Sequence, residues 1–342
     1  MRAVKRQLTR FAWGTTLAVP VLVATLALAA CGGSGSTASS SPSAVSSSSA
    51  ASSMSATPLP TPTVSGTIAF EKVTKAGDDQ GVARIITSDI YVVNADGSGL
   101  TMLARGAGRL SHPSWSPDGR RIVYAVYDEA NPTAALWVMN ADGSGPRQLT
   151  KGSLRGGEPA WSPDGKQIAF SASGGSQEGI CVIDVDGSGL RRVTRPSGGS
   201  SPGEGSAAWA PDDRILFLSL GDVWSTKLDG SGLVQLTKIG NVADFALSPD
   251  GKSLALDNNA DGVVEVVATR GGGTPVRLLD PVSDFIPDDP YAAPAWTPDG
   301  QALAVAGTGP RGSLLYVVNA DGSGLSAVPG VKAAAYPAWR PE

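Results

Sequence analysis

Mostly polar side chains stand three residues before the copies of a repeated Trp-centred motif, where a binding site could form. The six positions hold His112, Glu158, Ser206, Asp244, Ala293 and Tyr336. Imidazole and carboxylate groups bind ligands and exchange protons, and an aromatic ring can stack on a ligand. With Arg109 and Arg155 nearby, this row predicts a polar binding site at the mouth of a channel. The alternative, which the sequence alone favours, is that these side chains only meet water at the starts of strands.

The sequence offers few of the residues that nucleophilic catalysis or a zinc site would need. A Ser-His-Asp triad would have to use His112, the only histidine of the chain. One histidine and one cysteine in an apolar run, Cys181, cannot make the usual ligand set of zinc. We therefore predict no catalytic residue, no metal and no cofactor. One enzyme alternative stays open: a lactonase or lyase type of site, in which carboxylates such as Glu158 and Asp244 hold a divalent cation in the central channel.

Two turn motifs recur along the chain and must position these residues. A Trp-x-Pro-Asp type occurs six times, at 115–119, 161–165, 209–213, 247–251, 296–300 and 339–342, with Leu247 in place of one tryptophan. An Asp-Gly-Ser-Gly type occurs five times, within 94–99, 140–145, 184–189, 227–232 and 319–324. Proline presets φ for a tight turn, Asp bonds its own backbone, and Gly accepts positive φ. Each motif is therefore expected to reverse a strand.

Short apolar runs such as Ile122–Ala125 and Leu136–Met139 join the turns and predict strands. Each repeat then holds four antiparallel strands, which is one blade of a β-propeller. Residues 66–342 therefore predict an all-β, six-bladed propeller of four-stranded antiparallel blades. Because the first predicted strand, Thr67–Phe70, is the second of its blade, we expect the last strand, near Trp339, to complete that blade and close the ring.

The order of strands also predicts two different faces. In an up-down-up-down blade, both turn motifs project from the same side, which we call the turn face. The opposite side, the variable face, receives the other loops and the crossovers between blades, whose length and composition differ from repeat to repeat. Function is more often found on such loops. The row from His112 to Tyr336 should lie at the channel mouth on the variable face.

The repeats resemble those of the TolB-like six-bladed β-propellers, a family with WD40-like PD40 repeats. Trp161–Gly165 and Asn140–Gly145 carry the resemblance, which extends over nearly everything after residue 65. The resemblance implies the fold more than the function, because such propellers serve as interaction platforms, hydrolase gates or enzymes. TolB itself carries an α/β domain before its propeller, and here a lipoprotein-type tether stands in its place.

The N-terminal 65 residues predict that tether. Residues 1–30 combine basic residues with an apolar stretch, which is typical of an export signal, and Leu28–Gly32 looks like a bacterial lipobox. We expect cleavage before Cys31 and lipidation of its thiol, although an uncleaved membrane helix is the alternative. Residues 31–65 should then form a lipidated cysteine and a disordered linker, because Ser, Ala, Thr, Gly and Pro dominate there.

Charge and location restrict the partners. Cleavage of the leader removes four basic residues and takes the net charge from −4 to −8, which disfavours nucleic acid. We therefore predict a monomeric, membrane-anchored bacterial lipoprotein outside the cytoplasm. Its variable face is expected to bind a protein or an envelope polymer without performing chemistry.

Overall fold

The computed structural model describes the propeller region in eleven stretches. They are residues 64–75, 86–106, 108–128, 133–152, 154–173, 178–194, 204–258, 263–270, 275–279, 293–309 and 312–342. The chain divides into two compact units, 1–56 and 57–342, and the described residues all belong to the second. The expected export signal, Cys31 and nearly all of the expected linker lie outside the described residues. No helix that could cross a membrane occurs within the described stretches.

The described stretches form 24 strands, β1 to β24, arranged in five sheets. One sheet contains β24 (Ala334–Trp339), β1 (Thr67–Lys75), β2 (Ile86–Asn94), β3 (Thr101–Ala104), β4 (Arg109–Trp115), β5 (Arg121–Asp128), β6 (Thr133–Asn140) and β7 (Arg147–Gln148). A second contains β8 (Arg155–Trp161), β9 (Gln167–Ser173), β10 (Gly179–Asp184) and β11 (Arg191–Arg192). A third contains β12 (Gly205–Trp209), β13 (Ile215–Ser219), β14 (Asp222–Thr226) and β15 (Val234–Gln235).

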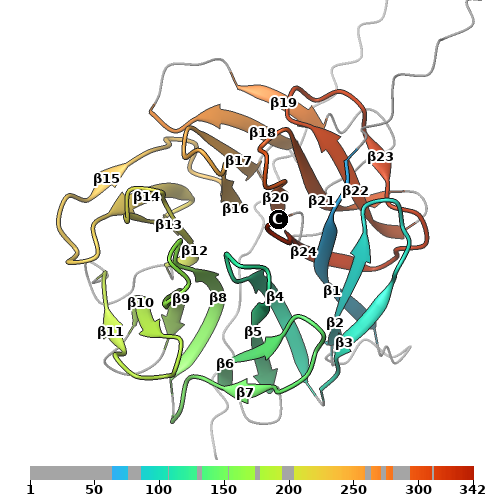
Figure 1. Cartoon of the computed structure of the whole chain (residues 1–342). Coiled ribbons are helices and arrows are strands. Elements are labelled where there is room, and N and C mark those ends of the chain that lie inside the picture. The colour runs from blue at the N-terminus through green and yellow to red at the C-terminus, as the bar shows by residue number, and fades with distance from the viewer. Residues whose placement is uncertain are drawn as a thin grey trace, which may run out of the picture. The chain divides into compact units, whose positions relative to one another are not determined.

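The last two sheets have the same order. One holds β16 (Val242–Leu247), β17 (Ser253–Asn258), β18 (Val263–Ala268) and β19 (Val276–Leu279), and the other holds β20 (Pro294–Trp296), β21 (Ala302–Gly309), β22 (Gly312–Asn319) and β23 (Ser326–Ala327). Figure 1 shows β4, β8, β12, β16, β20 and β24 nearest a common centre, with β3, β7, β11, β15, β19 and β23 at the periphery. We call the first set the inner strands. The described residues therefore form an all-β propeller.

Four-stranded antiparallel blades are confirmed, but the expectation of six such blades is not met among the described residues. Four sheets have four strands each, and the remaining sheet has eight. Within that sheet, one parallel pair, Ser88 with Arg109, joins β2 to β4. The Ser88 hydroxyl also donates to the carbonyl of Leu110 at 2.8 Å. These bonds hold the two groups of four strands so closely that they count as one sheet.

The C-terminal strand pairs with the first strand of the propeller. β24 lies antiparallel to β1, with Ile68 opposite Trp339 and Glu71 opposite Ala335. The backbone N–H of Arg340 extends this contact by donating to the carbonyl of Thr67 at 2.8 Å. An edge of β1 that would otherwise be open to other chains is thereby covered.

The apolar core lies between neighbouring sheets. One cluster combines Leu136 of β6 with Trp161 of β8 and Phe170 of β9, and another combines Leu216 of β13 with Phe245 of β16. Indole groups add hydrogen bonds across these junctions: Trp115, Trp161, Trp209 and Trp296 donate to the carbonyl oxygens of Ala338, Ser114, Ala160 and Ala246 at 3.1–3.2 Å. The acceptor always precedes the tryptophan or leucine of an adjacent inner strand. The small residues there thus have a bonding role besides close packing.

Both turn motifs project from the same face, as predicted. In the Trp-x-Pro-Asp turn, Asp118 Oδ1 accepts from Ser116 Oγ at 2.6 Å and from the backbone N–H of Arg120 at 3.1 Å. In the other turn, Asp142 Oδ1 accepts from the backbone N–H of Ser144 at 2.9 Å. The two turns meet where the N–H of Ala141 donates to the carbonyl of Arg120 at 2.8 Å. Equivalent bonds recur in later repeats and define the turn face.

Candidate channel-mouth site

The inner strands change direction at the predicted row of polar residues. His112, Glu158, Ser206 and Tyr336 have φ values of 51°, 50°, 36° and 46°. The pairing register of their strands shifts at or beside the same positions. A bulge re-aims a side chain, and a non-glycine residue at positive φ costs free energy unless its surroundings hold it there. These four side chains are therefore positioned by a strained backbone conformation.

A buried ion pair lies beside His112. The side chain of Glu71, at 0% exposure, accepts a hydrogen bond at 3.0 Å from Arg109 Nε and another from Ser111 Oγ. Ser111 Oγ also lies 2.8 Å from His112 Nδ1. Sequence reasoning proposed Arg109 but missed Glu71. The available signal was a single carboxylate within the apolar strand Thr67–Lys75, which needs a partner when it is buried.

Aromatic rings enclose this ion pair. The rings of His112 and Tyr336 have centroids 3.6 Å apart, and the Arg109 guanidinium lies 5.7 Å from the ring centre of Tyr127 and 5.8 Å from that of Tyr336. Burial, with the charge of Arg109, lowers the pKa of His112 to about 3. Burial raises the pKa of Tyr127 and of Tyr336 above the usual range. His112 is therefore neutral near pH 7 and cannot carry charge to a ligand.

Further carboxylates lie on two other inner strands, β8 and β16, and on β17 beside them. Glu158 accepts a hydrogen bond from the backbone N–H of Ser206, and burial raises its pKa. Asp244 on β16 stands directly opposite Asp257 on β17. Burial, followed by the charge of Glu158, raises the pKa of Asp244 to about 7, and burial raises that of Asp257 to about 6. Both are positions at which the ionised form is disfavoured.

Asp257 is the second residue that sequence reasoning missed. It is 1% exposed, and no described group donates a hydrogen bond to either of its carboxylate oxygens. A carboxylate directly after the apolar run Leu254–Leu256, within the same predicted strand, was the signal. A buried, unpaired carboxyl with a perturbed pKa is typical of a functional site, although structural groups can be perturbed too.

A cavity of about 490 Å³ opens beside Glu158 on the variable face. Its lining includes Glu158, Ser206, Leu220 and Val242. Leu220 lies in the turn between β13 and β14, has a φ of 55°, and is 62% exposed. The backbone N–H of Val242 donates to the carbonyl of Gly221 at 2.9 Å, which holds this turn against the crossover into β16. The cavity therefore combines a half-buried carboxylate, Glu158, with an exposed apolar side chain, Leu220.

The structure brings together five of the six predicted binding residues. The pKa values of Tyr127 and Tyr336 respond to Arg109, Glu71, Glu158 and Asp244, so these charges share one poorly solvated region with His112. Arg155 does not join them: it begins β8, is exposed, and stands opposite Ser173. Within the described stretches, no three His, Cys, Asp or Glu side chains group closely enough to hold a metal ion. The arrangement suits recognition of a polar or cationic group.

Comparisons with known proteins agree with this architecture. Residues 73–342 match the family model described as the TolB beta propeller domain, PD40. TolB from Acinetobacter baumannii has a similar structure, with a TM-score of 0.66 and 22% identity, over 81% of this chain and 67% of that one. Hydrazine synthase from Kuenenia stuttgartiensis has a TM-score of 0.61 at 14% identity, and the match covers 81% of this chain but only 47% of that one.

A chain of a nidogen/laminin complex is also similar, with a TM-score of 0.60 and 12% identity, over 80% of this chain and 98% of that one. At these identities the likeness concerns the fold. No curated protein sequence matches the chain.

Proposed function

The chain belongs to the TolB β-propeller family, and from that premise we propose that it is a non-enzymatic scaffold that binds a protein or an envelope polymer through its variable face. We count the eight-stranded sheet as two blades, which makes six. We also propose that residues 1–30 are an export signal, that Cys31 carries a lipid, and that residues 31–65 tether the propeller to a membrane outside the cytoplasm.

The observation that carries the binding role is the shared backbone strain of the inner strands. Four different non-glycine residues, His112, Glu158, Ser206 and Tyr336, occupy the same position of their strands at positive φ. Packing alone does not need such strain, because glycine would adopt the same backbone at less cost. Strained positions cluster where a ligand is recognised. Leu220, exposed beside Glu158, adds an apolar contact of the kind that protein partners bury.

The nature of the site supports binding rather than chemistry. His112 is held neutral by burial and by Arg109, so it is a poor proton acceptor near pH 7. Arg109 is committed to Glu71. Among the described residues, no positive charge offsets the pair of Asp244 and Asp257, and a basic side chain of a partner would supply one. Two of the structural neighbours are compatible with a protein-binding use of this fold: TolB itself, and a chain found in the complex of nidogen with laminin.

Site-specific photo-crosslinking in intact cells tests the proposed face. A photoreactive aromatic residue replaces Leu220 on the variable face, and the matched control carries it at Leu325, a leucine 41% exposed on the turn face. We expect a discrete crosslinked product from position 220 that disappears when Glu158→Gln and Asp244→Asn are added. Equal products from both positions, or a product from position 220 that persists in the Glu158→Gln, Asp244→Asn variant, would contradict the proposal.

The metal-dependent enzyme remains the competing hypothesis and predicts a different result. A divalent cation on Glu158 and Asp244 would give calcium-dependent thermal stabilisation that vanishes in the Glu158→Ala, Asp244→Ala double variant. Our proposal predicts no such shift. For the tether, Cys31→Ala is expected to abolish lipid labelling and release the protein from membranes, and unchanged membrane association would contradict the anchor.

A further inference from the structure

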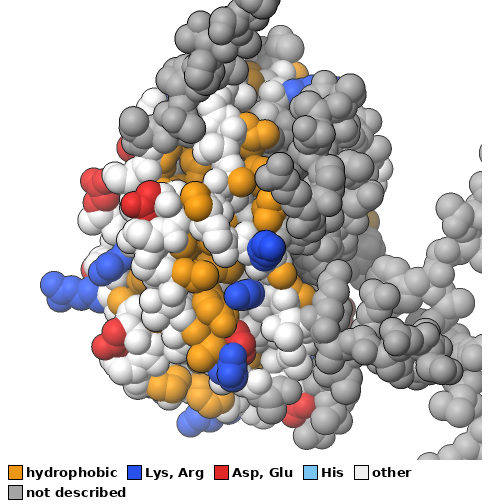
Figure 2. Space-filling model, turned by 90° about the vertical axis from the view of Figure 1, so that its right-hand side faces the viewer, with side chains coloured by type: hydrophobic (Ala, Val, Ile, Leu, Met, Phe, Trp, Pro, Cys, Tyr) orange, Lys and Arg blue, Asp and Glu red, His pale blue; other side chains and the backbone are white. Residues whose placement is uncertain are grey.

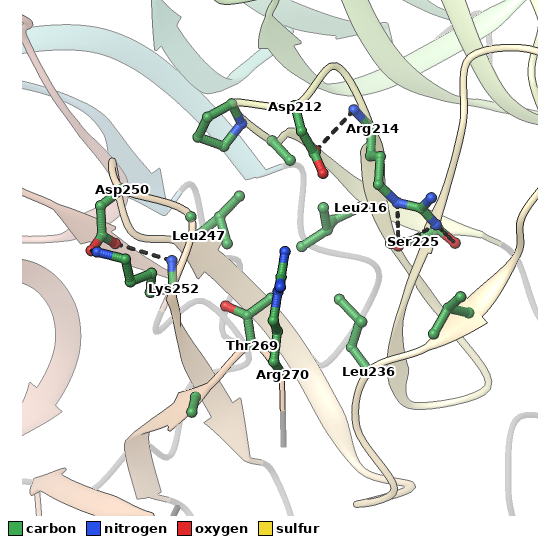
Figure 3. Close-up of a pocket in the computed structure, with 15 residues that line it drawn as sticks. Asp212, Arg214, Leu216, Ser225, Leu236, Leu247, Asp250, Lys252, Thr269 and Arg270 are labelled. Carbon is green, nitrogen blue, oxygen red and sulfur yellow. Dashed lines mark hydrogen bonds and ion pairs between the residues drawn. The ribbon is translucent and has the colours of Figure 1, made fainter. Parts of the chain in front are cut away.

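A second hollow lies on the turn face, away from the channel mouth. It has a volume of about 800 Å³ and lies between the sheet of β12–β15 and the sheet of β16–β19 (Figure 3). Its lining comes from turn residues such as Pro211, Asp250 and Lys252 and from strand residues such as Leu216 and Leu247. This size falls in the range of about 300–1,000 Å³ that is usual for ligand sites.

The hollow exists because one junction lacks its tryptophan. At the junction of β5 with β8, Trp161 packs in the core, donates its indole N–H to the carbonyl of Ser114 at 3.1 Å, and lies under the guanidinium of Arg121 at 4.7 Å. Leu247 occupies the position of Trp161 in its own repeat, and Arg214 precedes Ile215 as Arg121 precedes Ile122. A leucine cannot fill the volume of an indole, donate a hydrogen bond or receive a cation on a π face.

The remaining walls keep the features of a tryptophan site. Arg214 is fixed by hydrogen bonds from Nε and Nη2 to Ser225 Oγ, at 3.0 and 2.8 Å, and from Nη2 to the carbonyl of Gly232 at 2.5 Å. Figure 3 shows Leu216, Leu236 and Leu247 around the hollow, with Arg214 held by Ser225 at one side. A guanidinium fixed in its plane loses little conformational entropy when an aromatic ring stacks on it.

A polar group also awaits a partner at this hollow. Thr269 lines it, and the Thr269 hydroxyl oxygen is buried without a hydrogen-bond partner among the described residues. A buried hydroxyl without a partner costs free energy, and an indole N–H could donate to it. At the rim, Lys252 Nζ is paired with Asp250 at 3.1 Å, so the charge of Lys252 should have little influence on a ligand in the hollow. Apolar walls, the fixed cation of Arg214, the further cation of Arg270 and one acceptor together match a planar aromatic group with an N–H donor.

We propose that this hollow is a binding site for the tryptophan side chain of a partner polypeptide, whose indole takes the place that Trp161 fills at the junction of β5 with β8. The inference does not rest on the function proposed for the variable face, because the two sites lie on opposite faces. The partner would be recognised by an exposed tryptophan in an extended segment, since the hollow is larger than one ring and leaves room for flanking backbone.

Methyl NMR of the full-length protein tests the proposal with N-acetyltryptophanamide as the probe. Titration is expected to shift the methyl signals of Leu216, Leu236 and Leu247, whereas N-acetylleucinamide at equal concentration shifts them much less. The Leu247→Trp variant should fill the hollow from within, raise the thermal midpoint and abolish the response of Leu216 and Leu236. A wild-type protein whose three leucines do not respond, or a well-folded Leu247→Trp variant that still responds, would overturn the proposal.

A second pair of variants keeps the test independent of that substitution. Arg214→Met removes the stacking cation with little loss of volume and should weaken binding about 2- to 30-fold, which corresponds to about 0.5–2 kcal/mol for a cation–π contact. Arg121→Met makes the same change at the junction that Trp161 already fills and should leave binding of the probe unchanged. Equal effects of the two variants would refute stacking on Arg214.

Discussion

The turn face and the variable face differ in how their carboxylates are satisfied. On the turn face, Asp118 accepts two hydrogen bonds from its own turn, and the bond from Ser116 lowers its pKa. On the variable side of the channel, Asp244 and Asp257 stand opposite each other on the adjacent strands β16 and β17. Burial raises both of their pKa values. The repeated motifs thus build a self-sufficient scaffold. The carboxyl groups whose ionised form is disfavoured, Asp244 and Asp257, lie outside the repeated turn motifs.

Exposed apolar side chains are scattered over the described surface. Leucines directly after the Asp-Gly-Ser-Gly turns, including Leu100 and Leu325, are 40% and 41% exposed. In Figure 2, apolar side chains on the displayed side lie among scattered Lys, Arg, Asp and Glu side chains rather than in one broad continuous patch. Dispersed apolar residues of this kind are normal on a soluble surface. The hollow at Leu247 and the cavity beside Glu158 are two places where the described surface is recessed.

The largest effect is expected from breaking the buried ion pair of the channel. Arg109→Ala removes the cation beside Glu71, which is fully buried and then keeps only the bond from Ser111. We expect a loss of about 3 kcal/mol or more in the free energy of unfolding, because an uncompensated buried charge remains. Urea unfolding measures it.

The matched control is Arg105→Ala. Arg105 forms a pair of similar length with Asp89, at 3.1 Å, but its side chain is 66% exposed. Little change in stability is expected, because solvent screens such a pair. If the two variants lost the same stability, burial would not distinguish the channel from the surface.

The next effect concerns the pH dependence of stability. Folding raises the pKa of Asp244 to about 7, so the folded protein holds a proton that the unfolded chain has released above about pH 4. This contribution is complete below about pH 4 and is lost as the pH rises to 7. Asp244→Asn should therefore match the wild type near pH 4 and exceed it by about 1–2 kcal/mol at pH 8. Urea unfolding across this pH range checks the difference.

His112 and Asp250 provide the internal controls for that experiment. The low pKa of His112, about 3, makes stability fall as the pH drops below 6.5, but this occurs in both proteins and cancels in the difference. On the turn face, the bond from Ser248 lowers the pKa of Asp250 to about 2. Asp250→Asn should consequently lose stability relative to the wild type above about pH 4, with the opposite sign to Asp244→Asn. Equal signs would remove the distinction between the faces.

Local chemistry allowed the scaffold to be predicted. Proline, aspartate and glycine specify each turn within five residues, and alternating apolar runs specify the strands, so Trp161–Gly165 predicts its hairpin without any tertiary information. The row at His112, Glu158 and Asp244 followed from alignment of the repeats. The joining of two strand groups by Ser88 and Arg109 could not be predicted, because it depends on how closely adjacent sheets approach.

Partners that are distant in sequence explain the other misses. Arg109 of β4 reaches Glu71 of β1 across 38 residues, and Asp257 is significant only because Asp244 lies opposite it. The sequence also displays Leu247 in place of tryptophan, but the hollow follows from the shape of the neighbouring sheet. Side-chain packing between repeats, rather than the pattern within a repeat, decides these features.

A smaller effect is expected at the indole bonds between inner strands. Trp161→Phe removes the N–H that donates to the carbonyl of Ser114, whereas the buried Nε1 of Trp339 has no partner among the described residues. Both changes remove similar volume. Trp161→Phe should therefore cost about 1 kcal/mol more than Trp339→Phe, since one hydrogen bond is lost in the first case only. Chemical unfolding of the two variants checks this, and a larger cost for Trp339→Phe would contradict the assigned role of the indoles.

The smallest effect tests backbone strain itself, at a residue whose side chain carries no chemistry. Ala333, in the crossover before β24, has a φ of 55°, a conformation that costs an L-residue about 1–2 kcal/mol, and glycine adopts it freely. Glycine also gains entropy in the unfolded chain, so Ala333→Gly should stabilise the protein by only about 0.5 kcal/mol. Ala95→Gly, in a turn of the turn face where φ is not positive, should instead destabilise it by a similar amount. The two shifts in thermal midpoint should have opposite signs. A loss of stability in both variants would mean that the crossover on the variable face stores no strain, and the same reasoning would then fail for His112 and Glu158.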